Sequence, residues 1–247
     1  MKSEVVILTK AYRQEDTLDL IHHYQKLGFD HITLYLNDYE PVYEMTDENY
    51  KNVSMYLVKG FPNQLQIYDN HYSRNTEYDW IFFCDDDEYL RINKSKWKNI
   101  NEFLLSLDNN VKVFGVYWQF ASYKDGCEIE DRTQSMSQSF RYTPEGEYLT
   151  HYKSFVRKGQ VGGFKWNPHT FMTWRCVVNT VDGLMVNPEE PYKVRDPSKD
   201  DIKLIHYWRK SKKEMERKMG MLTPDHITPT TYEQVKPEHK LNYTKKL

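Results

Sequence analysis

Short apolar segments alternate with segments of helical period along the first half of the chain. The apolar segments are typical of buried strands, and the amphipathic ones are typical of helices that cover a sheet. Strands are expected at Glu4–Leu8, His31–Leu36, Val53–Val58, Trp80–Cys84 and Val111–Phe120. Helices are expected from Asp16 or Thr17 to Leu27, ended by Gly28, and at Asn63–Asn75 and Trp97–Leu107. Strands that alternate with helices predict an α/β fold with a mostly parallel central sheet flanked by helices.

The alternation becomes less regular beyond residue 120. The pattern predicts a polar loop at Asp125–Gly146 and a basic helix at Lys212–Met219. Between them it predicts three short strands, at Lys153–Arg157, Arg175–Asn179 and Ile202–His206. Residues 1–222 are therefore expected to form one domain with a less regular C-terminal part. Residues 223–247 contain three prolines and little periodicity, which predicts a tail packed on the surface or loose.

Composition narrows the possible classes of protein. The chain has 247 residues, 39% of them hydrophobic and 15% aromatic, which suffices for a large core with aromatic rings left over for a ligand. The net charge of -2 gives no reason to expect nucleic acid as a partner. No apolar run is long enough to span a membrane, and no signal-peptide pattern precedes the first strand. Three widely spaced cysteines do not predict disulfides, so we expect a cytoplasmic protein.

The most informative stretch follows the fourth expected strand. Trp80–Cys84 runs directly into Asp85, Asp86, Asp87 and Glu88. Four adjacent carboxylates repel one another, and a divalent cation with oxygen ligands would relieve this repulsion. In extended backbone, Asp85 and Asp87 would point to one side and bind the ion, while Asp86 would point to the other. The competing interpretation is a solvated acidic turn.

Polar residues also follow other strands that end at the same sheet edge, where open α/β sheets bind ligands. Thr9 and Arg13 lie in the first loop, where a guanidinium is suited to a phosphate. Asn37 and Asp38 end the second strand and are suited to a ribose hydroxyl, although they also fit an ordinary turn. The helix before the acidic stretch adds two further candidates for a nucleotide-sugar pocket, Gln64 and Asn70, and Asp86 is expected to line the same pocket.

The end of the fifth strand has side chains suited to a sugar. Trp118, Phe120 and Ser122 combine aromatic faces with a hydroxyl group, although a core position is the competing and favoured interpretation of Trp118. Asp125 and Glu128 are the nearest carboxylates for general-base chemistry, and the spacing does not distinguish them.

Two of the nine histidines are candidate metal ligands. His206 ends a strand, and His169 follows a proline. Imidazole together with carboxylate oxygens suits manganese better than magnesium. Lys210 and Ser211 follow His206 and are placed to meet a diphosphate.

Six motifs, in this order, resemble the GT-A glycosyltransferases of the family-2 and family-92 type. They are Arg13–Glu15, Tyr24–Ile32, Trp80–Tyr89, Trp118–Ser122, Lys153–Arg157 and His206–Ser211. The motif at Trp80–Tyr89 is similar to the D-x-D-E-F pattern of that group. The chain departs from the family pattern in four respects: Asp86 stands where the family usually has an apolar residue, Tyr89 replaces Phe, Ala121 replaces Gly, and Asn37-Asp38 has the reverse order.

The resemblance implies a single GT-A domain, Rossmann-like in its sheet, that transfers a sugar from a nucleotide-diphosphate donor, most often UDP-linked. The acceptor would be a hydroxyl of a glycan or polysaccharide, and the anomeric configuration would be inverted. Mn²⁺, or Mg²⁺, would bridge the diphosphate. In this interpretation Asp85 and Asp87 hold the metal and nucleotide, His206 is the third metal ligand with His169 in reserve, and Lys210 meets the diphosphate. The resemblance further assigns the nucleotide pocket to Thr9, Arg13, Asn37 and Asp38, the sugar side to Trp118–Ser122, and the role of base to Asp125.

Two other classes of protein remain open at this point. A sugar-phosphate nucleotidyltransferase would also use a metal-diphosphate site, but residues 9–15 lack the glycine-rich phosphate loop. A calcium-dependent carbohydrate-binding module would bind sugar without nucleotide. The acid spacing excludes an EF-hand loop.

Overall fold

The computed structural model describes residues 1–9, 14–37, 51–59, 64–75, 77–121, 129–140, 146–159, 162–163, 168–169, 171, 177–180, 192–208, 210–214 and 231–234. Within these residues one sheet has the strand order β11-β3-β2-β1-β4-β7-β6-β10-β5, with β8 beside β6 and β9 beside β7. The strands are β1 (Ser3–Thr9), β2 (His31–Asn37), β3 (Val53–Lys59), β4 (Trp80–Asp85), β5 (Glu88–Ile92), β6 (Val111–Phe120), β7 (Tyr148–Arg157), β8 (Val177–Thr180), β9 (Tyr192–Arg195), β10 (Ile202–His206) and β11 (Thr231–Gln234). The helices are α1 (Gln14–Leu27), α2 (Gln64–Arg74), α3 (Ile100–Ser106), α4 (Met136–Ser139) and the 3-10 turn η2 (Pro197–Lys199).

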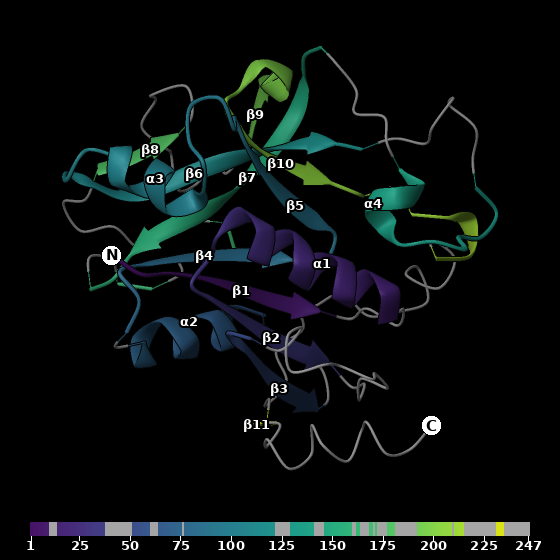
Figure 1. Ribbon diagram of the computed structural model, residues 1–247, viewed down its shortest axis with the longest axis horizontal. Helices are drawn as coiled ribbons and strands as arrows, with labels where there is room; N and C mark the ends of the chain where they lie inside the picture. Colours follow the sequence, from purple (N-terminus) through teal and green to yellow (C-terminus); the bar gives the residue numbers. More distant parts are fainter. Residues whose placement is uncertain are drawn as a thin grey trace.

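The N-terminal half of the sheet is parallel and is covered by helices on both faces. Strands β3, β2, β1 and β4 lie side by side, with α1 in front of them in Figure 1. Val5 and Ile7 of β1 pack in the same core cluster as α1, whereas Val6 and Leu8 pack with α2. Successive side chains of a strand point to opposite faces, so a wholly apolar strand needs a helix on each side. The predicted α/β class is confirmed.

The C-terminal half of the sheet is mixed. β7 enters between β4 and β6 and runs antiparallel to both, while β10 is parallel to β6 and antiparallel to β5. The parallel arrangement expected from the sequence therefore holds for β1–β4, where α1 joins β1 to β2 and α2 joins β3 to β4. It does not extend to β7, which is antiparallel to both of its neighbours, or to β5, which is antiparallel to β10.

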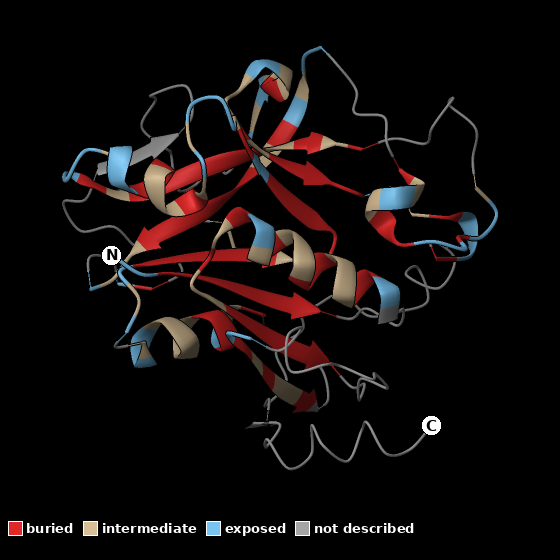
Figure 2. Cartoon of the chain, in the orientation of Figure 1, coloured by how far each residue is buried: buried red, intermediate tan, exposed pale blue. Residues whose placement is uncertain are grey.

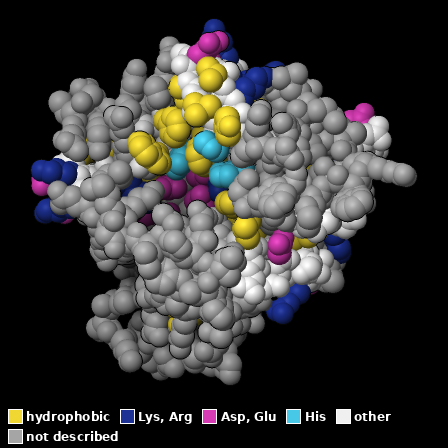
Figure 3. Space-filling view, turned by 180° about the vertical axis from the view of Figure 1, so that it is seen from behind, with side chains coloured by type: hydrophobic (Ala, Val, Ile, Leu, Met, Phe, Trp, Pro, Cys, Tyr) yellow, Lys and Arg dark blue, Asp and Glu magenta, His cyan; other side chains and the backbone are white. Residues whose placement is uncertain are grey.

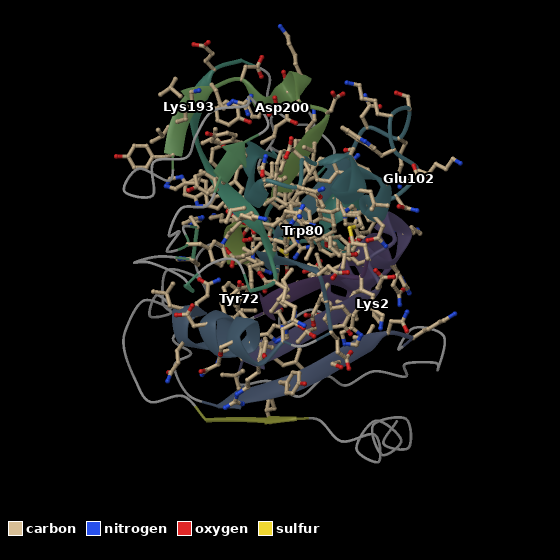
Figure 4. All side chains as sticks on the ribbon, turned by 90° about the vertical axis from the view of Figure 1, so that its left-hand side faces the viewer. Lys2, Tyr72, Trp80, Glu102, Lys193 and Asp200 are labelled. Carbon is tan, nitrogen blue, oxygen red and sulfur yellow. The ribbon has the colours of Figure 1, made fainter. Side chains whose placement is uncertain are left out.

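The core lies on both sides of the central strands. Figure 2 shows these strands as almost continuously buried, and Trp80, at the start of β4, lies among tightly packed side chains at the centre of the view in Figure 4. On one face the rings of Phe82 and Phe155 stack with centroids 4.4 Å apart, and Phe103 of α3 packs against them. This core fixes the strand ends at which the candidate site lies. None of the described helices has the length and apolar character needed to cross a membrane.

Most predicted elements are present, with changes at their ends. α1 begins at Gln14 rather than at Asp16 or Thr17, and the Asp16 carboxylate binds Arg132 instead of capping the helix. α3 begins at Ile100 rather than Trp97, because the Asn99 side chain accepts a hydrogen bond from the amide of Glu102 and caps the helix there.

Gly28 ends α1 as expected. Its φ of +85° is a left-handed conformation, and a Cβ at this position would come within 2.9 Å of the Asn99 side chain. Five elements were not predicted: β5, α4, β9, η2 and β11. α4 lies within the expected polar loop, and β11 lies within the expected tail, where it pairs with β3. Only residues 212–214 of the expected basic helix are described, and they are helical.

Candidate active site

The candidate site lies where the order of the parallel strands reverses. The sequence of strands 3-2-1-4 puts this reversal between β1 and β4, and ligands of open α/β sheets bind in the crevice beyond the carboxyl ends of such a strand pair. Leu8 of β1 is level with Asp85 of β4. One residue further on, the hydroxyl group of Thr9 donates a hydrogen bond of 3.0 Å to Asp86 Oδ2. Two of the predicted residues therefore meet at this edge.

Asp85, Asp86, Asp87 and Glu88 form a tight connection from β4 to β5, here called the acidic turn. Asp85 ends β4, Asp86 and Asp87 form the turn, and Glu88 begins β5. The expectation that Asp85 and Asp87 point to one side and Asp86 to the other is wrong, because it assumed extended backbone throughout. Asp86 and Asp87 instead share the ammonium group of Lys210, and Asp85 faces a different lysine, Lys153.

Lys153 of β7 is fully buried beneath the acidic turn. Its Nζ lies 2.9 Å from Asp85 Oδ2 and 3.9 Å from Glu88 Oε1. Burial alone would lower the pKa of Lys153, but Asp85 and Glu88 raise it above its ordinary value, so the lysine is charged. Gln64 of α2 donates a hydrogen bond of 2.5 Å to Asp85 Oδ1, which completes the polar surroundings of this carboxylate.

Glu88 is the most buried acid of the turn. Its Oε2 accepts a hydrogen bond of 2.8 Å from the amide of Asp85, while its Oε1 has no hydrogen-bond partner among the described residues. Burial raises the pKa of Glu88 well above its ordinary value, and Lys153 opposes this effect. Glu88 therefore shapes the turn from inside rather than facing a ligand.

Asp87 lies between His206, which ends β10, and Lys210, which follows it in the chain. Its Oδ2 is 3.2 Å from Lys210 Nζ, and its Oδ1 is 3.4 Å from His206 Nε2. Lys210 is also 3.8 Å from Asp86. Burial raises the pKa of Asp86, and Lys210 opposes the rise. Burial by itself would lower the pKa of Lys210, but Asp87 and Asp86 raise it overall.

Ring side chains surround His206. The centroid of Trp118 is 4.2 Å and that of Phe120 is 5.7 Å from the imidazole centroid. The ring centroids of His169 and Trp118 are 5.4 Å apart. The Nδ1 atom of His169 is 2.8 Å from the carbonyl oxygen of Tyr152. Burial lowers the pKa of His169 well below its ordinary value, so this ring is neutral and its Nδ1–H donates to that carbonyl.

The other candidates are distributed as follows. Asn37 ends β2 at the same sheet edge as Thr9. Asn70 lines a separate polar cavity with Glu4 and His31, which lie near the amino ends of β1 and β2, and so it is not brought to the acidic turn. Five candidates lie outside the described residues: Arg13, Asp38, Ser122, Asp125 and Glu128.

Lys153 is the principal residue that the sequence reasoning missed. In the sequence it stands within the Lys153–Arg157 motif, and a lysine so close to Tyr152 and Phe155 in an expected strand is itself a signal. A fully buried lysine needs a carboxylate partner, and the acidic turn is the richest source of carboxylates in the sequence.

The residues present offer two donors for a divalent metal. Within the part of the chain that the structure describes, no group of three or more His, Cys, Asp or Glu side chains is arranged around one metal position. Asp87 Oδ1 and His206 Nε2 are 3.4 Å apart, close to the separation of about 3 Å expected for neighbouring ligands of one octahedral ion. Small divalent ions are commonly held by one or two protein ligands, with phosphate oxygens and water completing the shell. The donor set therefore fits an ion that is bound together with a phosphorylated ligand.

Comparisons with known proteins give no close relative. No protein-family model matches the chain, and no curated protein sequence matches it. Among solved structures, the chain is similar to a glycosyltransferase involved in the glycosylation of the major capsid of PBCV-1, with 16% identity and a TM-score of 0.35 over 90% of this chain and 100% of that one. It is also similar to 4-diphosphocytidyl-2C-methyl-D-erythritolsynthase from Anaerococcus prevotii, with 12% identity and a TM-score of 0.31 over 63% of this chain and 70% of that one. Likenesses this distant carry no argument about function.

Proposed function

We propose that the chain is a metal-dependent glycosyltransferase of the GT-A type. Its donor is a nucleotide-diphosphate sugar of the UDP type, and its acceptor is a glycan hydroxyl. The observation that carries this proposal is the convergence of His206 and Lys210 on Asp87 at the reversal of strand order. A metal ligand pair and a cation side by side suit a diphosphate, which needs both charge compensation and orientation. The motif order of the sequence supports the same class of enzyme.

Each residue has a defined task in this proposal. Asp87 and His206 hold Mn²⁺, or Mg²⁺, which when bound acts as a Lewis acid on the departing diphosphate. Lys210 contacts the diphosphate oxygens and compensates the charge that develops on them. Thr9 fixes the Asp86 carboxylate, and this contact holds the edge of the nucleotide pocket. Lys153 fixes Asp85, so that the acidic turn keeps its shape when the ligand leaves.

The sugar side of the site is assigned to Trp118 and Phe120. Both rings flank His206, so a sugar stacked on them would lie next to the metal position. Transfer with inversion requires a base to deprotonate the acceptor hydroxyl, and the proposal keeps Asp125 for this role.

Calorimetry with UDP, GDP and CMP, each with Mn²⁺ and with EDTA, tests the proposed class. The expected result is binding of one nucleoside diphosphate in Mn²⁺ and much weaker binding in EDTA. A sugar-phosphate nucleotidyltransferase would instead bind the nucleoside triphosphate and form a nucleotide-sugar from a sugar phosphate. A carbohydrate-binding module would bind no nucleotide under any of these conditions, and that result would end the transferase proposal.

A further inference from the structure

A continuous series of ring side chains leads away from Asp87. His206 of β10, Trp118 of β6, His151 of β7 and Tyr192 of β9 follow one another, with successive centroid distances of 4.2, 5.1 and 5.6 Å. Four different strands contribute these rings, so the series crosses the strands instead of following one of them. We name these four residues the ring track.

The ring track leads from the buried site to an exposed surface. His206 is only 5% exposed, whereas Tyr192 at the other end is 47% exposed. Leu149 and Val194 continue the same surface, because strand register pairs Leu149 with Val194 and His151 with Tyr192, which puts all four on one face of the β7–β9 ribbon. Leu149 is 51% exposed and Val194 is 61% exposed. Figure 3 shows hydrophobic and histidine side chains gathered beside acidic side chains on one face of the molecule.

The buried end of the ring track has unmet hydrogen-bonding capacity. Trp118 Nε1 and His206 Nδ1 are buried and have no hydrogen-bond partner among the described residues. A buried polar atom without a partner costs about 1–3 kcal/mol, so such atoms usually meet a ligand or water. The buried end of the ring track is therefore polar as well as aromatic.

Rings that alternate with hydrogen-bonding atoms are suited to carbohydrate. The C–H faces of a sugar stack on aromatic rings, and its hydroxyl groups bond to polar atoms at the ring edges. A single sugar would cover only the rings nearest Asp87. The three successive ring contacts extend well beyond one sugar unit and reach the exposed face of β7 and β9.

We propose that the ring track is the binding surface for the acceptor, and that the acceptor is an oligosaccharide of at least two sugars. This inference rests on the proposed glycosyltransferase function. The sugar that receives the transfer lies against Trp118, next to the metal position, and the preceding sugars lie over His151 and Tyr192. His151 and Tyr192 therefore determine acceptor length, and neither was identified from the sequence.

The test is direct binding of oligosaccharides, measured on the full chain with an array that carries glycans of one to six sugars. The wild-type chain is expected to bind glycans of two or more sugars and to bind single sugars much more weakly. Tyr192→Ala is expected to lower the affinity for the best glycan by about 3- to 10-fold, the value of one aromatic stacking contact. Leu105→Ala, which removes an exposed side chain from α3, is the matched control and is expected to bind like the wild type.

Three outcomes would overturn the inference: equal binding of single sugars and longer glycans, unchanged affinity of Tyr192→Ala, or binding only of glycans that carry a lipid. The last outcome would mean that Leu149 and Val194 contact an apolar chain. Calorimetry of the same preparation with UDP and Mn²⁺ distinguishes failure of the acceptor inference from failure of the proposed function. If the nucleotide binds and the glycans do not, only the acceptor inference is wrong.

Discussion

Lys153 Nζ lies 2.9 Å from Asp85 Oδ2, although the two residues belong to strands that the sequence pattern does not connect. The lysine is fully buried and also faces Glu88. The protein itself therefore compensates the inner half of the acidic turn. Asp87 instead faces His206 and Lys210, where the proposed metal position lies.

Lys153→Met should destabilise the fold. Removal of one partner from a buried ion pair leaves uncompensated charge inside the protein and typically costs about 3–5 kcal/mol. We expect a loss of this size in the free energy of unfolding, measured by urea denaturation. Lys94→Met, at an exposed position, should change it by less than about 0.5 kcal/mol. Equal stability of the two variants would show that Lys153 does not hold the turn together.

Lys210→Met should weaken binding of UDP more than binding of UMP. The ammonium group is placed beside the acidic turn, where a diphosphate would supply the additional phosphate contact. A charge-assisted hydrogen bond is worth about 1.5–3 kcal/mol, which predicts a loss of about 10- to 100-fold for UDP. Calorimetry in Mn²⁺ measures both nucleotides. Lys212→Met, two residues away and half-exposed, is the control. A loss of the same size for UDP and UMP would rule out a diphosphate contact.

Arg132 joins three segments at the base of the site. Its guanidinium donates to Asp16 Oδ1 at 2.8 Å and to Glu214 Oε2 at 2.7 Å, and Glu214 in turn accepts from the hydroxyl group of Ser211. Arg132→Met would leave two buried carboxylates without a cation. We expect a loss of about 3–5 kcal/mol in the free energy of unfolding. Arg74→Met, at an exposed position of α2, should have little effect, and a similar loss in both variants would contradict this role.

His23 should make the protein sensitive to acid. Burial lowers its pKa to about 4, and its Nε2 donates to the carbonyl oxygen of Leu90 in the neutral state. The unfolded chain, with the ordinary pKa of 6.5, binds more protons between these two values. The stability contribution is therefore complete above pH 6.5 and is lost as the pH falls toward 4.

Urea denaturation at several pH values measures this dependence. Between pH 6.5 and 4, His23→Gln should lose less of its free energy of unfolding than the wild type loses. If the wild type and the variant change in parallel, the pKa of His23 is not the cause.

Much of the parallel half of the fold follows from local pattern. Trp80–Asp85 is wholly apolar until its last residue, so its place in a sheet covered on both faces could be predicted. The ends of the helices could be predicted less well, because distant polar side chains compete with the helix for its capping residues. Asp16 looks like an N-cap in the sequence, but Arg132, far away in the chain, binds its carboxylate.

The candidate site could be predicted only in part. The acidic turn and His206 stand at strand ends, which the hydrophobic pattern locates. The orientation of the acids could not be predicted, because a turn at Asp86 and Asp87 replaces the extended backbone that the argument assumed. Lys153 and the ring track depend on β7 lying between β4 and β6, and this order is set by tertiary packing rather than by local sequence.

In the proposed site, Asp87 and a nucleoside diphosphate bind one metal ion together. Electron paramagnetic resonance measures free Mn²⁺ and so gives its affinity with and without UDP. Because linkage is reciprocal, UDP should raise the affinity of the wild-type protein for Mn²⁺ by at least about tenfold. Asp87→Asn should abolish this increase, while Glu77→Gln, an exposed residue just before β4, should retain it. An affinity for Mn²⁺ that UDP leaves unchanged, or an increase that persists in Asp87→Asn, would show that Asp87 and the nucleotide do not share a metal ion.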